Sequence, residues 1–229
     1  MRKGDERRQE LLAAAQRLFC MKGYEATSVQ DILDVLHISK GGFYHHFASK
    51  EALLETLFFQ RASAMLGETE ASLSLLEAPM DRINRLLYGC LPLRAEEADF
   101  TAMLLPILEK PEGRALRLCY QEALHSAFLP SMEREIALAR EDEVVFPVCP
   151  DLADVILHML AQCWVDMAGL ITACMKKAQR PEAFALLGIL DKYRCCIQRL
   201  LDAPYGSVEI ISLEEWDRTV EAIFSRITV

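Results

Sequence analysis

Hydrophobic residues recur every three or four positions along most of this chain, which is the spacing of amphipathic helices. One face of the first such segment is apolar and consists of Leu11, Leu12, Ala15, Leu18 and Phe19. Gly23 follows this segment and suits the C-cap of a helix, because glycine adopts positive φ without strain. The pattern therefore predicts a first helix that ends near residue 22.

A shorter helix is predicted from about Ser28 to Leu36, since Ser28 is a good N-cap residue and Asp31 follows three positions later. Its inward face would consist of Val29, Ile32, Leu33 and Leu36. The helical pattern stops at His37, and histidine is among the few residues other than glycine that tolerate positive φ. A tight turn is expected at this point.

Ser39 can cap a further helix, in which Phe43 and Phe47 stand four residues apart and point inward together. The residues left on its outer side are Lys40, Gly41, Gly42, Tyr44, His45 and His46. They supply a cation for phosphates, hydroxyl and imidazole groups for hydrogen bonds, and glycines that allow close approach. Two short helices joined by a tight turn, at about residues 28–47, predict a helix-turn-helix unit that can place one helix in a DNA groove.

The run from Lys40 to Lys50 reads Lys-Gly-Gly-Phe-Tyr-His-His-Phe-Ala-Ser-Lys. It resembles the Lys-Gly-x-x-Tyr-x-His-Phe-x-x-Lys run that ends the DNA-binding domain of the TetR family of bacterial transcriptional regulators. The resemblance extends upstream through the first predicted helix and so covers roughly residues 5–65. Two positions depart from the family pattern: His37 stands where glycine is usual, and Gly42 stands where threonine is more often found.

The resemblance implies a set of DNA-contacting residues: Ser28, Gln30, Lys40, Gly41, Gly42, Tyr44, His45, His46 and Lys50. Within this set Tyr44, His46 and Lys50 are expected to hold phosphates. Lys40 and His45 are expected to reach base edges. Glycine at position 42 cannot donate a hydrogen bond from a side chain. We therefore expect fewer direct contacts to bases, or a shift of this role to Lys40.

The rest of the chain is also expected to be helical. Apart from a brief strand-like stretch at 207–211, helical periodicity recurs between proline and glycine breaks. Helices are predicted at approximately 50–68, 79–92, 99–109, 112–139, 151–178, 182–202 and 213–226, with a kink at Pro130. The predicted fold is all-α. An N-terminal three-helix DNA-binding domain occupies residues 5–65, and a helical domain occupies 66–229, which the resemblance assigns to ligand binding and dimerisation.

The predicted helix at 151–177 is apolar around most of its circumference, but one stripe is polar: Asp154, His158, Gln162 and Asp166. This stripe can be a solvated helix edge, the lining of a pocket or part of a subunit interface. Other pocket candidates are Tyr88, Phe100, Met103, Tyr120, His125, Phe128, Trp164 and Met167. Each of these alone is better explained as a core residue. Taken together with His158 and Gln162, they favour an apolar effector oriented by a few polar groups.

The formal net charge of the chain is −9, but residues 1–50 carry +2 and the remainder therefore carries −11. A locally basic end on an acidic body favours a small, oriented contact with phosphates. It argues against nonspecific binding along the whole length of a polyanion. The DNA contact is therefore expected at the N-terminal end alone.

The eight cysteines form no Cys-x-x-Cys pair and show no zinc-type spacing with histidine. We expect no metal site and no cofactor, and we interpret these cysteines as reduced core residues of a cytoplasmic protein. Redox sensing by the adjacent Cys195 and Cys196 is the alternative, although neighbouring helical side chains point apart.

The longest uncharged stretch, 155–165, is shorter than the ~20 residues that span a bilayer, and the N-terminus lacks a signal-peptide pattern.

These observations predict a ligand-responsive, sequence-specific DNA-binding regulator, most simply a repressor that leaves its operator when a small apolar effector binds. A homodimer is expected, because two recognition helices must reach major grooves about 34–36 Å apart. The alternative is a helix-turn-helix protein that acts as an activator or a protein-interaction module without an effector. An enzyme is not expected, since the chain has no Gly-x-Ser-x-Gly, phosphate-loop or His-Glu-x-x-His motif.

Overall fold

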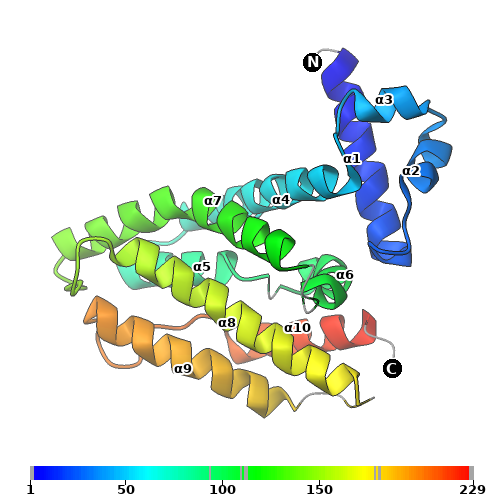
Figure 1. Ribbon diagram of the computed structural model, residues 1–229. Coiled ribbons are helices and arrows are strands. Elements are labelled where there is room, and N and C mark those ends of the chain that lie inside the picture. The colour runs from blue at the N-terminus through cyan, green and yellow to red at the C-terminus, as the bar shows by residue number, and fades with distance from the viewer. Residues whose placement is uncertain are drawn as a thin grey trace.

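The computed structural model describes residues 3–92, 94–108, 110, 113–177, 179 and 182–226, and these residues form helices and no strand. The helices are α1 (Lys3–Lys22), α2 (Val29–Leu36), α3 (Lys40–Tyr44), α4 (Lys50–Leu73), α5 (Pro79–Gly89), η1 (Ala95–Glu97), α6 (Ala98–Leu108), α7 (Arg114–Glu141), α8 (Leu152–Met175), α9 (Ala183–Leu201) and α10 (Leu213–Arg226). In Figure 1 the first three helices form a small head at one end, and α4 runs from it beside α7 into a larger bundle. The predicted all-α class is confirmed.

The predicted helices agree with the structure to within a few residues at most ends. α4 continues to Leu73, five residues past its predicted end, and the short helix η1 was not expected. Residues 109, 112 and 178, at predicted helix ends, lie outside the described residues. Pro130 lies inside α7, and the helix continues on both sides of it.

The strand-like stretch at 207–211 lies outside the helices and forms no strand. The side chain of Asn84 on α5 donates to the carbonyl oxygen of Ser207 at 2.9 Å and accepts from the backbone N–H of Glu209 at 3.0 Å. An amide side chain therefore supplies the hydrogen bonds that a neighbouring strand would give.

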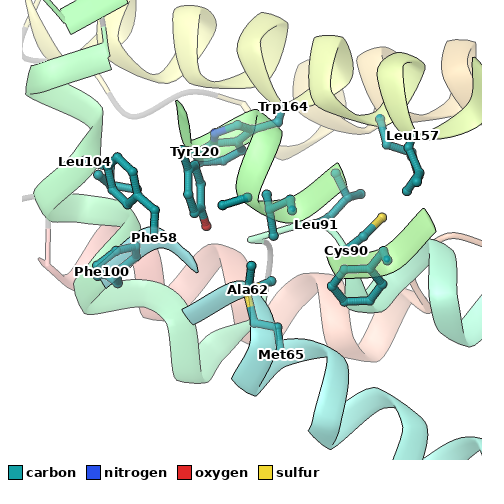
Figure 2. Packing of buried hydrophobic residues seen from close by; sticks show 14 of the residues in the cluster. Phe58, Ala62, Met65, Cys90, Leu91, Phe100, Leu104, Tyr120, Leu157 and Trp164 are labelled. Atoms are coloured by element: carbon teal, nitrogen blue, oxygen red, sulfur yellow. The ribbon is translucent and has the colours of Figure 1, made fainter. Parts of the chain in front are cut away.

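One helix belongs to both parts of the molecule. The first turns of α4 bury Leu53 and Leu54, and its next turns bury Phe58, Ala62 and Met65 in the bundle core. Figure 2 shows this second group among buried side chains from several other helices. The predicted domain boundary at residue 65 thus falls inside α4.

Among the described residues α8 is the one helix whose length and apolar composition would allow it to cross a membrane, and half of its most apolar window is buried in the fold. Trp164, Met167 and Ile171 on α8 are at most 2% exposed. It lies between α7 and α9 (Figure 1). The hydrophobicity of α8 is thus accounted for by its position in the core.

α4 and α5 approach each other closely where Gly89 faces Thr69. A Cβ atom added at Gly89 would lie 2.2 Å from Thr69 Oγ1, which itself donates to the carbonyl of Met65 at 2.7 Å. Thr69 is only 3% exposed, so it has little room to move. The absence of a side chain at residue 89 therefore sets the spacing of these two helices.

We expect Gly89→Ala to lower the free energy of unfolding by about 1–3 kcal/mol, because the added methyl group overpacks this contact. Gly67→Ala on α4 is the matched control, since a Cβ atom there meets nothing within 4 Å. That control should raise stability by up to about 1 kcal/mol through helix propensity. Denaturant unfolding measures both changes, and a shift of the same sign in both variants would contradict the packing argument.

Candidate nucleic-acid interface

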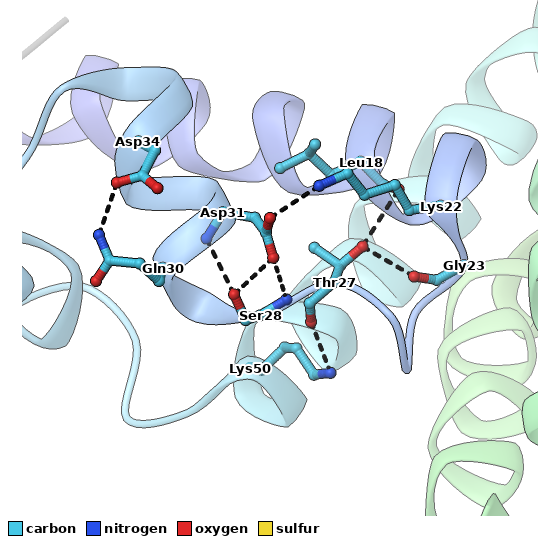
Figure 3. Close-up of polar contacts among 9 residues, drawn as sticks. All are labelled: Leu18, Lys22, Gly23, Thr27, Ser28, Gln30, Asp31, Asp34 and Lys50. Atoms are coloured by element: carbon cyan, nitrogen blue, oxygen red, sulfur yellow. Dashed lines mark hydrogen bonds and ion pairs between the residues drawn. The ribbon is translucent and has the colours of Figure 1, made fainter.

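A complete capping box fixes the start of α2. The Ser28 N–H donates to Asp31 Oδ2 at 2.7 Å, and the Asp31 N–H donates back to Ser28 Oγ at 3.1 Å. Lys22 Nζ, at the end of α1, donates to Asp31 Oδ1 at 2.8 Å. The hydrogen bonds from Lys22 and Ser28 hold the pKa of the Asp31 carboxyl well below its usual range. Figure 3 shows that this carboxylate joins α1 to α2.

The turn between α2 and α3 depends on His37. Its φ is +51° and ψ is +45°, and its backbone N–H donates to the carbonyl of Leu33. This is a left-handed C-cap, which confirms that histidine occupies the position of positive φ that is usually given to glycine. The chain reverses direction there, and Ser39 then caps α3 by accepting the N–H of Gly42 at 3.2 Å.

α3 has a buried side and an exposed side. Phe43 and Phe47 are at most 4% exposed, and their ring centroids lie 6.0 Å apart. Lys40, Tyr44 and His45 are exposed on the surface. Phe43 faces inward and Lys40 and Tyr44 face outward, as predicted. The helix is shorter than expected: it ends at Tyr44, so His45 and Phe47 lie just past its end.

Gly41 and Gly42 have ordinary negative φ, so the backbone does not require glycine at either position. A Cβ atom at Gly42 would be 3.6 Å from Ser39 Oγ, which is an ordinary van der Waals contact. What these glycines provide is a surface without side chains next to Lys40. A DNA backbone could approach that surface closely.

Three of the residues implied by the resemblance are engaged within the head. Ser28 caps α2, and Gln30 Nε2 donates to Asp34 Oδ1 at 2.7 Å. Lys50 Nζ donates to the carbonyl oxygens of Tyr24 and Thr27, at 2.8 and 2.9 Å, and lies 4.2 Å from the centroid of the Tyr24 ring. Lys50 thus joins the α1–α2 turn to the first residue of α4.

The remaining residues of that set lie on or next to α3. Within the described part of the chain, Lys40 Nζ and the Tyr44 hydroxyl have no hydrogen-bond or ion-pair partner. The His45 and His46 rings meet edge to face at 5.0 Å between centroids, with His46 half-buried. The side chains most available to a ligand are therefore Lys40, Tyr44 and His45.

We expect Lys50→Met to lower the free energy of unfolding by about 1–3 kcal/mol, because two partly buried carbonyls lose their donor while the aliphatic stem is kept. Lys40→Met is the control and should leave stability unchanged, since Lys40 is exposed. If Lys50 instead holds a phosphate, its loss should reduce the slope of log affinity against log salt by about 0.9. Thermal unfolding and salt-dependent DNA binding separate the two roles.

The pocket candidates fall into three groups, and His125 and Trp164 from two of them line one small cavity. Buried in the core are Phe100, Met103, Tyr120, Phe128 and Trp164, whereas His125, His158 and Gln162 lie at the α7–α8 surface. Tyr88 lines a surface groove between α5 and α10, where burial raises the pKa of its hydroxyl to about 12. Met167 is fully buried in the core, too. The sequence-based set therefore does not form one pocket.

The core group contains two buried polar atoms without partners. Tyr120 Oη and Trp164 Nε1 have no hydrogen-bond acceptor or donor among the described residues. The centroid of the Tyr120 ring lies 5.0 Å from that of Phe58 and 6.1 Å from that of Phe100. Figure 2 draws these three rings. The cavity next to Trp164 has a volume of about 20 Å³, which is room for a single water molecule.

A buried ion pair that sequence reasoning missed connects α4 to η1. Glu97 is 2% exposed, and its carboxylate accepts from Arg61 Nε at 2.5 Å and from Arg94 at 3.3 Å. The Arg61 guanidinium also lies 5.6 Å from the centroid of the Phe100 ring. No sequence signal identified Glu97 as buried, because glutamate next to Glu96 is most simply interpreted as a solvated charge.

The cysteine prediction holds in part. All eight cysteines are free thiols, and burial raises the pKa of Cys90 and of Cys163 to about 12, as expected for unreactive core residues. Cys195 and Cys196 are exposed on α9, so their assignment to the core was wrong. Helical periodicity alone did not reveal that this part of α9 faces outward.

Comparison with known proteins supports the interpretation of the head. The sequence model of the family described as bacterial regulatory proteins, tetR family, matches residues 11–57. The transcriptional repressor AcnR of Corynebacterium diphtheriae is 30% identical over 156 residues, which are 66% of this chain and 77% of the relative. The transcriptional repressor KstR2 of Mycolicibacterium smegmatis is 35% identical over 80 residues, and that alignment spans 35% of this chain and 39% of the relative.

The fold agrees with solved structures of the same family. A TetR-family transcriptional regulator from Pectobacterium atrosepticum superposes with a TM-score of 0.62 at 23% identity, covering 88% of this chain and 97% of that one. The fold and the surface around α3 define a helix-turn-helix DNA-binding regulator. The chain belongs to the TetR family of transcriptional regulators, and it is a regulator and not an enzyme.

Proposed function

We propose that the protein is a transcriptional repressor that binds an operator as a homodimer and releases it when a small apolar molecule enters the bundle core. The observation that carries this proposal is α4, which holds the head at its first turn and is buried in the candidate effector site by its middle turns. A displacement in the core is thereby connected by one helix to the DNA-contacting surface. The relatives AcnR and KstR2, both named as repressors, favour repression over activation.

The DNA contact is assigned to the exposed side of α3 and its neighbours. Lys40 and His45 would reach base edges, while Tyr44 and His46 would contact phosphates. Ser28 and Gln30 would contribute from the start of α2, and Gly41 and Gly42 would allow close approach. Lys50 is assigned a positioning role, because its ammonium group already binds two carbonyl oxygens of the α1–α2 turn.

The dimer is assigned to the outer faces of α8 and α9. On α8 an exposed stripe of small or uncharged residues includes Val155, Gln162, Gly169 and Ala173. On α9, Phe184 is 83% exposed beside Gly188, at a hollow of about 640 Å³. Small residues let two helices approach closely, and an exposed phenylalanine favours burial by a partner.

The effector site is assigned to the core around Tyr120 and Trp164. Their unpaired polar atoms could orient a ligand that carries one acceptor and one donor on an apolar frame. The closed core has no space for such a ligand, so the ligand-bound conformation must be more open than this one. Effector and operator would then lower each other's affinity by the same factor. We place this regulator in the cytoplasm, where the DNA is.

The operator contact is tested with a fragment from upstream of the protein's own gene and a scrambled fragment of equal length. We expect Lys40→Ala to reduce the preference for the specific fragment by about 10- to 100-fold, as the loss of a base contact does. Arg140→Ala, at the far end of α7, is the control for a general loss of positive charge. Binding without sequence preference in the unmodified protein would instead favour an interaction module.

Two tyrosines provide a test of the effector site that needs no knowledge of the ligand. Tyr120→Phe removes a buried hydroxyl that has no partner, so we expect the free energy of unfolding to rise by about 1 kcal/mol. Tyr193→Phe is the matched control, because its hydroxyl donates to Asp166 at 2.8 Å and its loss should destabilise. Denaturant titration gives both values.

The same variants are then compared in an effector screen, in which small aromatic and aliphatic compounds are tested for release of the operator. A compound that releases the operator from the unmodified protein and from the Tyr193→Phe variant should release it less effectively from the Tyr120→Phe variant. An undiminished response of Tyr120→Phe would place the effector elsewhere.

A further inference from the structure

Three side chains of the kinds that bind metal ions meet where α7 crosses α8. His125 comes from α7, and Asp154 and His158 stand one turn apart on α8. One ligand atom from each residue can be chosen so that all three lie within 4.8 Å of one another. Two helices distant in sequence thus bring two imidazoles to one carboxylate.

The distances suit a small cation. His125 Nε2 lies 2.8 Å from Asp154 Oδ1, and His158 Nδ1 lies 3.4 Å from Asp154 Oδ2. In a tetrahedral zinc site with bonds of about 2.0–2.2 Å, neighbouring ligand atoms are about 3.3–3.5 Å apart. Of the two observed distances, 3.4 Å lies within this range and 2.8 Å lies below it, and they involve different oxygen atoms of Asp154. To bind an ion, His158 Nδ1 has to give up its hydrogen bond to the Asp154 carbonyl oxygen, which is 2.9 Å long.

The ligand types select the metal. Two imidazoles and one carboxylate suit Zn²⁺, Co²⁺, Ni²⁺ or Cu²⁺, whereas Mg²⁺ and Ca²⁺ prefer ligand sets made of oxygen alone. Three protein ligands leave a fourth position for water or an exogenous group. The side chains are 25%, 47% and 69% exposed for His125, Asp154 and His158, so an ion can enter from solvent.

Hydrogen bonds alone give a competing account of this cluster. His125 Nε2 and Asp154 Oδ1 can share a proton, and His158 Nδ1 lies 2.9 Å from the backbone carbonyl of Asp154. The first contact joins α7 to α8 without an ion, whereas the second lies within α8. The His125 and His158 ring centroids are 4.8 Å apart, which is an ordinary distance for a pair of rings. A shared cation would bind both imidazoles and the carboxylate between them.

We propose that His125, Asp154 and His158 bind one divalent transition-metal ion that clamps α7 to α8. The site is separate from the head. His125 also lines the small cavity next to Trp164, and His158 stands on the exposed side of α8 that carries the proposed dimer face. The proposal departs from the expectation of no metal site. That expectation rested on sequence spacing, and sequence spacing cannot relate residue 125 to residues 154 and 158.

The test uses the full-length protein with any polyhistidine tag removed. Zn²⁺ is titrated in competition with a chromophoric chelator, and one ion per chain is expected to bind. His158→Ala should lower the Zn²⁺ affinity at least about tenfold, since even the loss of an outer-shell partner costs about 10- to 100-fold. His158 is largely exposed, so this variant should remain folded, and circular dichroism checks that it does.

His45→Ala is the matched control for Zn²⁺ affinity, because it removes an exposed imidazole from the other end of the molecule and should leave that affinity unchanged. Asp154→Asn should weaken binding as His158→Ala does. Added Zn²⁺ should raise the melting temperature of the unmodified protein and not that of these two variants. Together these results would establish the site.

Cobalt identifies the ligands independently. Co²⁺ bound by two nitrogens and an oxygen should show visible bands without thiolate-to-metal charge transfer. Charge-transfer bands that disappear in a Cys195→Ser, Cys196→Ser double variant would move the ion to α9 and overturn the proposal. Equal Zn²⁺ affinity in unmodified protein and His158→Ala would overturn it as well.

Discussion

Burial of α4 in two places is the constraint on which the rest of the structure depends. Leu53 and Leu54 pack in the head, and Phe58, Ala62 and Met65 pack in the bundle, all on one continuous helix. Each fully buried Leu, Phe or Met side chain contributes roughly 1.5–3 kcal/mol. The helix cannot leave either core without losing several such contributions. The head is therefore oriented by the packing of the bundle.

Polar contacts also hold α4, both in the head and in the bundle. At the head, Lys50 joins the first turn of α4 to carbonyls of the α1–α2 turn. In the bundle, Arg61 joins α4 to the buried Glu97 of η1, directly before α6. Removing Arg61 would leave the buried Glu97 carboxylate without one of its two arginine partners, so this contact resists sliding of α4. Movement of α6 would therefore be transmitted to α4 through one guanidinium group.

The features that were predicted from sequence are local ones. Ser28 and Ser39 were expected as caps, and His37 as a position of positive φ, because each depends on residues within a few positions of it. Helix limits followed from periodicity for the same reason. The features that were missed depend on contacts between distant segments. The carbonyl partners of Lys50 are 23 and 26 residues away, and Glu97 is buried by an arginine 36 residues earlier.

The candidate sites show the same limit. The residues around α3 could be found from one continuous motif, whereas the pocket candidates were chosen by residue type and fell into three groups. The polar stripe on α8 illustrates why. Its spacing is visible in the sequence, but the partner of each member is set by the neighbouring helix: His125 for Asp154, and Tyr193 for Asp166.

Charge distribution gives the head a role beyond its few side-chain contacts. Residues 1–50 carry +2 while the rest of the chain carries −11, so phosphates are attracted at one end and repelled by the acidic body. Such a field orients the molecule before any base is read. Under the proposed DNA contact, orientation matters more because Gly41 and Gly42 offer no side chain, which leaves few groups on α3 to read bases. On that proposal, a rigid and correctly oriented head is the condition under which so few base contacts can distinguish one operator.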